Sequence, residues 1–336
     1  MKALLYPEYG RLCMADIPSP LPEPDCVVVN VAACGICGSE IETYRKRSPR
    51  RQPPLVMGHE FCGTVSAVGP AVTQFKIGDR VISHSIVHCG RCAPCARGHT
   101  HLCTNREVFG MHRPGAFAEF VNVPARVLVP WPAALPREAA VLTEPLANGV
   151  HVNNLLAHVA GQNALVIGAG PIGLMCAVAL IAKREANVRI TDLNTDRLRV
   201  ARELGAMTGP ESDAAELRAW LKTQAGEGFD VIVDAVGSSA TKRDSLELLR
   251  PGGACVWIGL HEDPVTLNSY EVTLPEKQIL GTYAATMQEL ATAVQILASG
   301  RFTVNSLIKP RKLDDGLLAF EDALTAKSIK SVILPS

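Results

Sequence analysis

Four cysteines are crowded into one short stretch of this sequence, at spacings that suit a metal ion. The pattern is Cys89-x2-Cys92-x2-Cys95-x7-Cys103. Four thiolates complete a tetrahedral zinc site and leave no position for a substrate, so such a site would be structural. Its metal would order a loop that lacks a hydrophobic core of its own. We therefore predict a closed zinc site here, with a set of unligated thiols as the alternative.

A second set of donor side chains lies earlier in the chain. Cys37 stands in Cys34-Gly-Ile-Cys37-Gly-Ser39-Glu40, and His59-Glu60 follows Gly58. Cysteine, histidine and glutamate can hold zinc and leave one position for water or an alcohol. Each segment alone is weak evidence, because a buried cysteine is usually a small hydrophobic residue. Taken together with the four-cysteine lobe at Cys89–Cys103 and with a nucleotide fingerprint, the two segments indicate an open metal site.

The nucleotide fingerprint is a glycine-rich segment between a predicted strand and a predicted helix. It reads Gly168-Ala-Gly170-Pro171-Ile172-Gly173, and its glycines permit a tight turn and close approach of a pyrophosphate to the helix N-terminus. Asp192 ends the next strand, 19 residues beyond Gly173, where a carboxylate can accept hydrogen bonds from a ribose. That charge would repel a 2′-phosphate, which favours NAD over NADP. Arg197 could instead be a phosphate partner, and Asp192 only a helix cap or a solvated residue.

The hydrophobic pattern predicts two kinds of architecture around these residues. Short alternating runs separated by glycine and proline fill the first part, which is typical of a small barrel-like β domain. From about Glu144 onward, apolar strands alternate with helices, which indicates a parallel, doubly wound sheet. The predicted strands are 27–32, 60–68, 80–83 and 117–123 in the first part and 163–168, 187–191, 229–236, 254–259 and 278–283 in the second, with helices at 171–184, 195–204 and 241–249.

The last fifty residues return to a mixed pattern. Leu290, Val294 and Leu297 share one face of an amphipathic helix that Gly300 ends. We predict an apolar strand near 302–308, a helix at 314–324 and a final strand at 331–334.

Bulk properties are typical of a two-domain protein of balanced charge. The 336 residues exceed one ordinary core. Apolar residues make up 47% and charged residues 20%, as in compact soluble proteins rather than disordered ones. Lysine plus arginine and aspartate plus glutamate both number 33, so we expect neither nucleic acid nor a membrane as partner.

Three features favour a reduced, cytoplasmic protein. The apolar start at residues 1–6 is broken at once by Pro7 and Glu8, so we expect no signal peptide. Residues 164–182 carry no charge and approach the length of a membrane span, but three glycines and a proline divide them. The eleven cysteines are an odd number, and without an export signal we expect free thiols rather than disulfides.

In the order of its motifs, the chain resembles the zinc-containing medium-chain dehydrogenases along its whole length. The matching residues are Cys37-Gly-Ser39, Gly58-His59-Glu60, Gly78-Asp-Arg-Val81, the four-cysteine lobe, Glu144-Pro-Leu-Ala147, and Gly168–Gly173 with Asp192. The Glu144 segment is similar to that of the polyol branch, which includes sorbitol, threonine and galactitol-1-phosphate dehydrogenases.

This resemblance implies an α/β protein with a GroES-like, β-rich catalytic domain at 1–145 with 286–336 and an NAD-binding Rossmann domain at 146–285. It implies that Cys37, His59 and either Glu60 or Glu144 hold a catalytic zinc, the other glutamate lying behind the ligands or exchanging with them. A homodimer or homotetramer is also expected. The resemblance places the NAD contacts at Gly168, Gly170, Pro171, Ile172, Gly173, Asp192, Arg197, Ile258, Gly259, Leu260, Thr282 and Tyr283.

Two positions depart from the family pattern. Members usually carry aspartate where this chain has Glu40, which orients the histidine ligand, so ligand geometry or basicity could change. Many also carry histidine in place of Glu42, where it relays the alcohol proton. The resemblance therefore leaves Ser39 as the first member of the proton path, with Glu42 or Tyr44 as candidate successors.

The expected reaction is zinc-dependent, NAD-linked oxidation of a secondary alcohol of a polyol, sugar alcohol or sugar-alcohol phosphate to the ketone. Zinc polarises the hydroxyl and the nicotinamide accepts the hydride. The alternative within the family is a 3-hydroxy amino acid dehydrogenase of the threonine type. A metal-free reductase of activated double bonds would not need Cys37, His59 and Glu60 together. A non-catalytic protein of the same fold is a further alternative.

A basic segment follows the first donor cysteine. Tyr44-Arg-Lys-Arg-Ser-Pro-Arg-Arg51 carries five positive charges. It could grip a substrate phosphate through charge-assisted hydrogen bonds. A solvated surface loop is the other interpretation of such a cluster.

Overall fold

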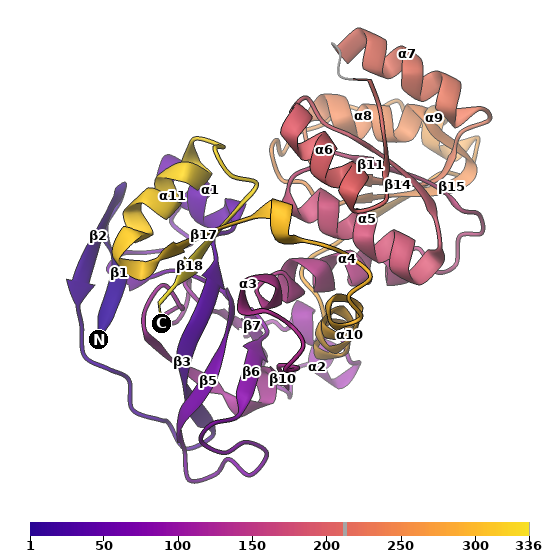
Figure 1. The fold of residues 1–336 in the computed structure, drawn as a ribbon. Helices are drawn as coiled ribbons and strands as arrows, with labels where there is room; N and C mark the ends of the chain where they lie inside the picture. Colours follow the sequence, from indigo (N-terminus) through magenta and orange to yellow (C-terminus); the bar gives the residue numbers. More distant parts are fainter. Residues whose placement is uncertain (211–213, 336) are drawn as a thin grey trace. The chain divides into compact units, whose positions relative to one another are not determined.

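The computed structural model describes residues 1–210 and 214–335, which fold into two compact units (Figure 1). Unit 1 comprises Met1–Glu144 and Thr286–Ser336, and unit 2 comprises Pro145–Ala285. Unit 2 is therefore one continuous insertion between the two segments of unit 1. Within the described ranges, no helix combines the length and the apolar character needed to cross a bilayer.

Unit 1 consists mainly of antiparallel strands around one hydrophobic core. Its strands are β1 (Lys2–Glu8), β2 (Arg11–Asp16), β3 (Cys26–Gly35), β4 (Leu55–Val56), β5 (Glu60–Val68), β6 (Arg80–Ser83), β7 (Ile86–Val87), β8 (Glu107–Val108), β9 (Phe120–Pro124), β10 (Leu128–Pro130), β17 (Ile308–Lys312) and β18 (Lys330–Leu334). The largest sheet has the order β10-β6-β5-β3-β18-β17, with β9 also paired to β3, and β2-β1-β4 and β7-β8 form two smaller sheets. Strand β3 is central to the large sheet and buries Val27, Val29 and Val31 in the core.

Short helices connect and cover these strands. They are α1 (Gly38–Lys46), α2 (Ala93–Ala96), α3 (Arg137–Ala140), α10 (Met287–Ala298) and α11 (Gly316–Leu324), with 3-10 turns η1 (Thr100–Leu102), η2 (Ala125–Val127), η3 (Asn305–Leu307) and η4 (Leu313–Asp315). Helix α10 buries Leu290, Val294 and Leu297, the face that the sequence predicts. Helix α4 (Thr143–Leu155) begins in unit 1 and continues into unit 2.

The strand predicted at 302–308 is wrong. Phe302, Val304 and Leu307 are buried, but the 3-10 turn η3 occupies the end of that segment and β17 begins only at Ile308. Alternating burial in an irregular segment mimics the two-residue period of a strand, so periodicity alone could not separate the two.

The described part of unit 2 is built on six parallel strands. They are β11 (Asn163–Ile167), β12 (Asn187–Thr191), β13 (Met207–Thr208), β14 (Phe229–Asp234), β15 (Leu249–Trp257) and β16 (Gln278–Gly281), and the helices are α5 (Pro171–Arg184), α6 (Thr195–Glu203), α7 (Ala214–Ala225), α8 (Ser239–Glu247) and α9 (Tyr270–Thr273). The sheet order is β13-β12-β11-β14-β15-β16. The chain leaves β11 for β12 on one side and later returns to β14 on the other, so the topological switch point lies at β11.

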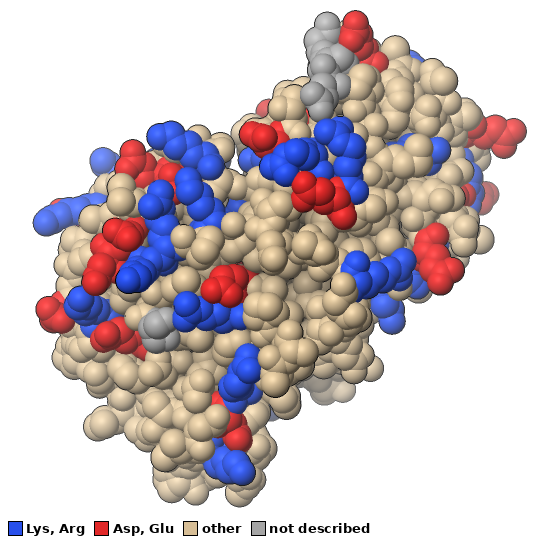
Figure 2. Space-filling model, viewed as in Figure 1, with Lys and Arg blue, Asp and Glu red and all other residues tan. Residues whose placement is uncertain are grey.

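The face of the molecule drawn in Figure 2 carries charges of both signs. On the face drawn in Figure 2, lysine and arginine side chains are interspersed with aspartate and glutamate on both units. This distribution accords with a chain whose 33 basic and 33 acidic residues balance.

Candidate active site

The loop from Cys89 to Cys103 brings four thiols together. One sulfur from each of Cys89, Cys92, Cys95 and Cys103 lies within 4.8 Å of the other three. The Cys92 sulfur is 3.4 Å from that of Cys95 and 3.7 Å from that of Cys103. Sulfurs bound to one tetrahedral zinc at about 2.3 Å are about 3.8 Å apart. The donor type and spacing therefore fit a zinc ion with all four positions filled.

These thiols differ in acidity because backbone N–H groups donate more hydrogen bonds to some of the sulfurs than to others. Backbone N–H groups of Cys95 and Thr104 lower the pKa of Cys92 to about 6. Burial and the neighbouring Cys92 sulfur raise the pKa of Cys95 to about 12. Because a metal binds thiolates rather than thiols, Cys92 is the sulfur most ready to bind a metal at neutral pH.

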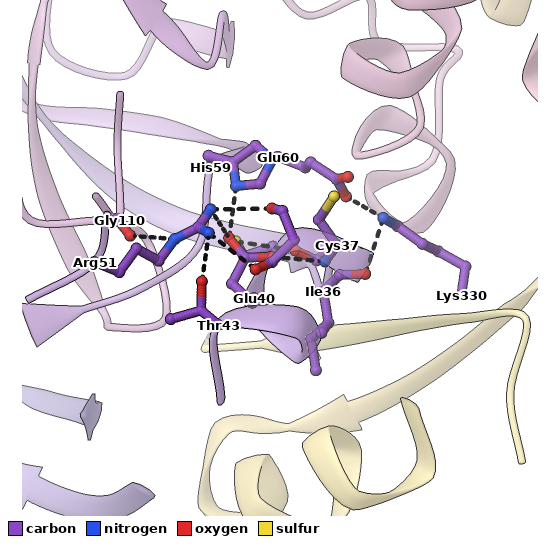
Figure 3. Close-up of polar contacts among 12 residues, drawn as sticks. Ile36, Cys37, Glu40, Thr43, Arg51, His59, Glu60, Gly110 and Lys330 are labelled. Carbon is purple, nitrogen blue, oxygen red and sulfur yellow. Dashed lines mark hydrogen bonds and ion pairs between the residues drawn. The ribbon is translucent and has the colours of Figure 1, made fainter. Parts of the chain in front are cut away.

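Cys37, His59 and Glu60 come together from two neighbouring strands (Figure 3). Cys37 follows β3 as the N-cap of α1, and His59 directly precedes β5, which begins at Glu60. The two strands are antiparallel, and Gly35 pairs with Glu60, so the donor segments meet at one end of the sheet. One donor atom from each residue lies within 4.8 Å of the other two. Three such donors leave a tetrahedral metal one open position.

Gly58 makes this close approach possible. Its φ is +99°, a left-handed conformation that side chains rarely adopt. A Cβ atom at this position would lie 2.6 Å from a ring carbon of Phe117 and 2.8 Å from the Cys34 sulfur. The glycine before His59 is therefore required both by the backbone conformation and by packing.

Glu40 is fully buried and fixes the orientation of His59 (Figure 3). Its Oε1 lies 2.6 Å from His59 Nδ1, and its Oε2 accepts the Cys37 N–H at 2.8 Å. Burial alone would raise the pKa of Glu40, but His59 and Arg51 lower it to about 2. An ionised carboxylate only accepts hydrogen bonds, so His59 carries its proton on Nδ1 and presents Nε2 to a metal. Glutamate in place of the family's aspartate thus keeps the histidine contact.

Arg51 holds the other side of Glu40. Its guanidinium lies 3.5 Å from Glu40 Oε1 and donates to Ser39 Oγ at 3.0 Å, to Ser39 O at 2.9 Å and to Thr43 Oγ1 at 3.0 Å. A further hydrogen bond reaches Gly110 O at 2.8 Å. Arg51 is 3% exposed, so this arginine of the basic segment is a buried structural group and is not available to a substrate phosphate.

The rest of the basic segment is on the surface. Lys46 forms an ion pair with Glu42 at 3.0 Å, and Arg45 donates to Leu324 O. Arg47 and Arg50 are exposed. Of the five charges in this segment, the structure thus leaves these last two as the candidates for contact with a phosphate.

Glu42 and Tyr44, the expected successors of Ser39 in the proton path, have other partners in the structure. Glu42 is exposed and paired with Lys46, while the Tyr44 ring packs edge-on against Phe320 at 5.2 Å. Ser39 Oγ instead accepts a hydrogen bond from Arg51. Because arginine has no acceptor, the Ser39 hydroxyl must direct its own proton elsewhere.

Two further charged residues surround Glu60. Lys330, the first residue of β18, forms a buried ion pair with the Glu60 carboxylate and donates to Ile36 O at 3.0 Å. Glu144, in the first turn of α4, is 8% exposed. Burial raises the pKa of Glu144, and the negative charge of Glu60 adds to this while His59 opposes it. Both glutamates therefore lie near His59, as the two alternatives for the metal ligand require.

In unit 2, the predicted nucleotide segments all follow carboxyl ends of parallel strands. Gly168 follows β11, Asp192 follows β12, Ile258 follows β15 and Thr282 follows β16. These ends lie at one edge of the sheet, and the crevice outside that edge, next to a switch point, is where such sheets bind ligands. The predicted coenzyme residues that share this edge are Gly168, Gly170, Pro171, Ile172, Gly173, Asp192, Arg197, Ile258, Gly259, Leu260, Thr282 and Tyr283.

The three fingerprint glycines have different surroundings. A Cβ at Gly173 would lie 1.8 Å from Gly168 O, so helix α5 can pack this close to β11 only with glycine there. At Gly170 a Cβ would meet no atom within 4 Å. The second glycine therefore faces open space, where a pyrophosphate can approach the backbone at the start of α5.

Asp192 and Arg197 form a pair rather than alternatives. Asp192 Oδ2 accepts the Ala169 N–H at 2.8 Å and lies 3.4 Å from the Arg197 guanidinium, and Oδ1 accepts the Asn194 N–H at 2.9 Å. Asp192 is thus fixed against the fingerprint turn, and it partly neutralises the arginine that could otherwise attract a phosphate.

Sequence patterns gave Arg51 only the roles of a phosphate contact or a solvated charge, and they gave Lys330 no role. Arg51 is the one charged residue of its segment that the structure buries. Lys330 lies two residues before the apolar run Val332-Ile-Leu334. A single charge at the start of a buried strand is the signal that could have pointed to a buried ion pair.

Comparisons with known proteins agree with this geometry. Residues 23–133 match the family "Alcohol dehydrogenase GroES-like domain" and residues 171–299 match "Zinc-binding dehydrogenase". The L-threonine 3-dehydrogenase of Chelativorans sp. (strain BNC1) is 35% identical over 317 residues, which are 93% of this chain and 92% of the relative.

Two solved structures share the whole fold. A zinc-binding dehydrogenase of Sinorhizobium meliloti 1021 bound to NADP has a TM-score of 0.89 and 29% identity, covering 99% of both chains. The galactitol-1-phosphate dehydrogenase of Escherichia coli has a TM-score of 0.90 and 25% identity, covering 100% of both. Fold and donor set thus define an oxidoreductase of the alcohol dehydrogenase type. The chain belongs to the zinc-binding, medium-chain alcohol dehydrogenase family, with its GroES-like and Rossmann-type parts.

Proposed function

We propose that this enzyme oxidises the secondary alcohol of a 3-hydroxy amino acid of the threonine type, with zinc and NAD. The observation that carries the reaction class is the open group of a half-buried Cys37 with the buried His59 and Glu60. The substrate class draws its support from the L-threonine 3-dehydrogenase relative, whose match extends over almost the whole chain. This support favours the threonine-type alternative over the polyol that the sequence analysis placed first.

The proposal assigns the metal ligands to two sites. Cys37, His59 and Glu60 hold the catalytic zinc, because their donor atoms already lie within 4.8 Å of one another, and Glu144 is the nearby carboxylate behind them. Cys89, Cys92, Cys95 and Cys103 hold a structural zinc. Unit 1 is then the catalytic domain and unit 2 the coenzyme domain.

The residues around the open site prepare it for proton and hydride removal. When bound, zinc polarises the substrate hydroxyl and the nicotinamide accepts the hydride. Glu40 keeps the proton of His59 on Nδ1. Arg51 occupies an acceptor site of Ser39 Oγ, which leaves the hydroxyl proton of Ser39 free to be donated and makes Ser39 the first carrier of the substrate proton.

For the coenzyme we propose NAD, on the basis of Asp192. Its carboxylate stands beside the fingerprint turn, where it accepts the ribose hydroxyls and repels a 2′-phosphate. The NADP-bound relative makes this a point to test. Wild-type enzyme should show a higher kcat/KM with NAD, and Asp192→Ala should reduce the ratio between the coenzymes. A wild-type preference for NADP would contradict the assignment.

A substrate panel tests the reaction. Absorbance of the reduced coenzyme is followed with L-threonine, D-threonine, galactitol 1-phosphate and free galactitol, each at matched concentration. We expect the highest kcat/KM with L-threonine and no turnover by Cys37→Ala. Turnover of none of the alcohols by zinc-loaded protein would contradict the proposal.

A polyol phosphate is the second candidate, favoured by the fold match to galactitol-1-phosphate dehydrogenase and by the exposed Arg47 and Arg50. If these arginines bind the phosphate, replacing both with glutamine raises KM for the phosphorylated polyol far more than for the free polyol. If KM of the double variant stays within about twofold of the wild-type value for both polyols, Arg47 and Arg50 are only solvated charges.

We further propose a cytoplasmic homodimer or homotetramer, as the resemblance implies.

A further inference from the structure

Lys330 ties the end of the chain to the open metal group (Figure 3). Strand β18 pairs with the end of β3, where Val332 lies opposite Gly35, and the Ile36 N–H donates to Ser331 O at 2.9 Å. The side chain of Lys330, two residues before Val332, donates a hydrogen bond from Nζ to Ile36 O at 3.0 Å. The same Nζ pairs with Glu60. One ammonium group thus contacts both the backbone before Cys37 and the carboxylate after His59.

The space for this ion pair is built into the sheet. A Cβ at Gly35 would lie 2.3 Å from Glu60 Oε2 and 2.9 Å from Lys330 Cε. Any other residue at position 35 would therefore displace the pair. Both partner side chains are about 1% exposed, so water does not screen the charges and the interaction is strong.

The Glu60 carboxylate can bind either of two cations, a metal ion or the Lys330 ammonium group. Its carboxylate belongs to the donor group with Cys37 and His59, and it is also the counter-ion of Lys330. A divalent ion bound by Glu60 would stand close to the buried ammonium, and unscreened like charges repel. Without the metal, Lys330 instead neutralises a carboxylate that would otherwise be a buried, unpaired charge.

We infer that Lys330 competes with the metal for Glu60, so that this lysine weakens metal binding at the open site and stabilises the site when it is empty. The inference rests on the proposed metal centre at Cys37, His59 and Glu60. It makes Lys330 a positioning residue that sets metal affinity, in contrast to an orienting partner whose loss would weaken metal binding.

The test measures zinc affinity directly. Zinc-loaded wild type, Lys330→Gln and Lys330→Met are equilibrated with graded concentrations of a chelator of known affinity, and retained zinc is measured by elemental analysis. We expect both neutral variants to hold the more labile zinc about tenfold more tightly or better, within the range that groups behind metal ligands control. Unchanged or weaker binding in both would overturn the inference.

Three controls isolate the mechanism. Lys330→Arg keeps the charge and should stay within about threefold of wild type, and Lys327→Gln removes an exposed charge from the same end of the chain and should have no effect. In a Glu60→Gln background, Lys330→Gln should lose most of its effect, because coupled residues are not additive. Undiminished tightening there would show a general charge effect and overturn the competition for Glu60.

The outcome also separates this inference from the proposed metal centre. Cys37→Ala should remove one of two zinc ions per chain. If Cys37→Ala retains as much zinc as wild type, the metal centre itself is wrong. If it loses one zinc while the Lys330 variants bind like wild type, the centre stands and only the inference fails.

Discussion

The four-cysteine lobe and the Cys37–His59–Glu60 group hold their donors together by different means. The lobe takes all its donors from one loop of fifteen residues, between Cys89 and Cys103. Its turns place the sulfurs, with Gly90 and Gly98 in left-handed conformations. The described partners of its thiols are neighbouring backbone amides, the side chain of Thr104 and one another.

The open group depends on residues from distant parts of the chain. Glu40 from α1 orients His59, Arg51 holds Glu40, and Lys330 from the last strand holds Glu60. Its donors are buried or half-buried. A site that only holds a metal can therefore be encoded by a short segment, whereas a site that must keep one position open needs support from the whole unit.

The strongest expected effect is the loss of activity in Cys37→Ala. Removing one donor of an incomplete ligand set should lower kcat/KM by at least about a thousandfold, because the open position loses its metal. Elemental analysis should fall from two zinc ions to one. Cys13→Ala, which removes a half-buried thiol outside both groups, is the matched control and should behave as wild type. Full activity of Cys37→Ala would contradict the assignment of the open group as the catalytic site.

Cys95→Ala should harm stability rather than chemistry. A closed site supplies folding energy to its loop, so its loss should lower the free energy of unfolding by about 3 kcal/mol or more, because loss of a metal is among the changes with the largest effects on stability. Chemical denaturation measures this, and kcat per active site at low temperature should stay near that of wild type. A stable Cys95→Ala enzyme without turnover would reverse the roles of the two groups.

Glu40→Gln should weaken the open site alone. The amide can no longer accept the His59 proton with a full negative charge, and loss of such support typically costs 10- to 100-fold in metal affinity or activity. Glu40→Asp, the residue usual in the family, should recover much of the loss if the shorter side chain still reaches Nδ1. Equal zinc loss from the cysteine lobe in Glu40→Gln would show that the sites are not independent.

The smallest effect concerns thiol reactivity inside the lobe. In zinc-depleted protein, Cys92 has a pKa of about 6 and Cys95 of about 12, so Cys92 is already a thiolate at neutral pH. Alkylation of Cys92 should be about tenfold faster or more at pH 7 and level off above that pH, while that of Cys95 keeps rising. Mass spectrometry of the labelled peptides follows both. Equal rates would contradict the lowering of the Cys92 pKa by backbone amides.

Much of the fold follows from local pattern. Strands β5, β6 and β12 and helix α5 have the bounds that the sequence predicts, because the apolar pattern of each segment is clear. Prediction failed where local signals mislead. Strand β15 begins at Leu249 rather than at 254, since Pro251-Gly-Gly253 resembles a turn although the chain continues through it with a shift in register beside β14.

The candidate metal and coenzyme residues could be identified from the amino-acid sequence, because thiol spacing and glycine patterns act over a few residues. How those residues are supported follows from the folded chain. Folding buried Arg51 among Ser39, Thr43 and Glu40, although that arginine stands in a run of surface charges. It also brought Lys330 from the last strand to Glu60. Burial and pairing of charges depend on contacts between segments far apart in the chain, which no local spacing records.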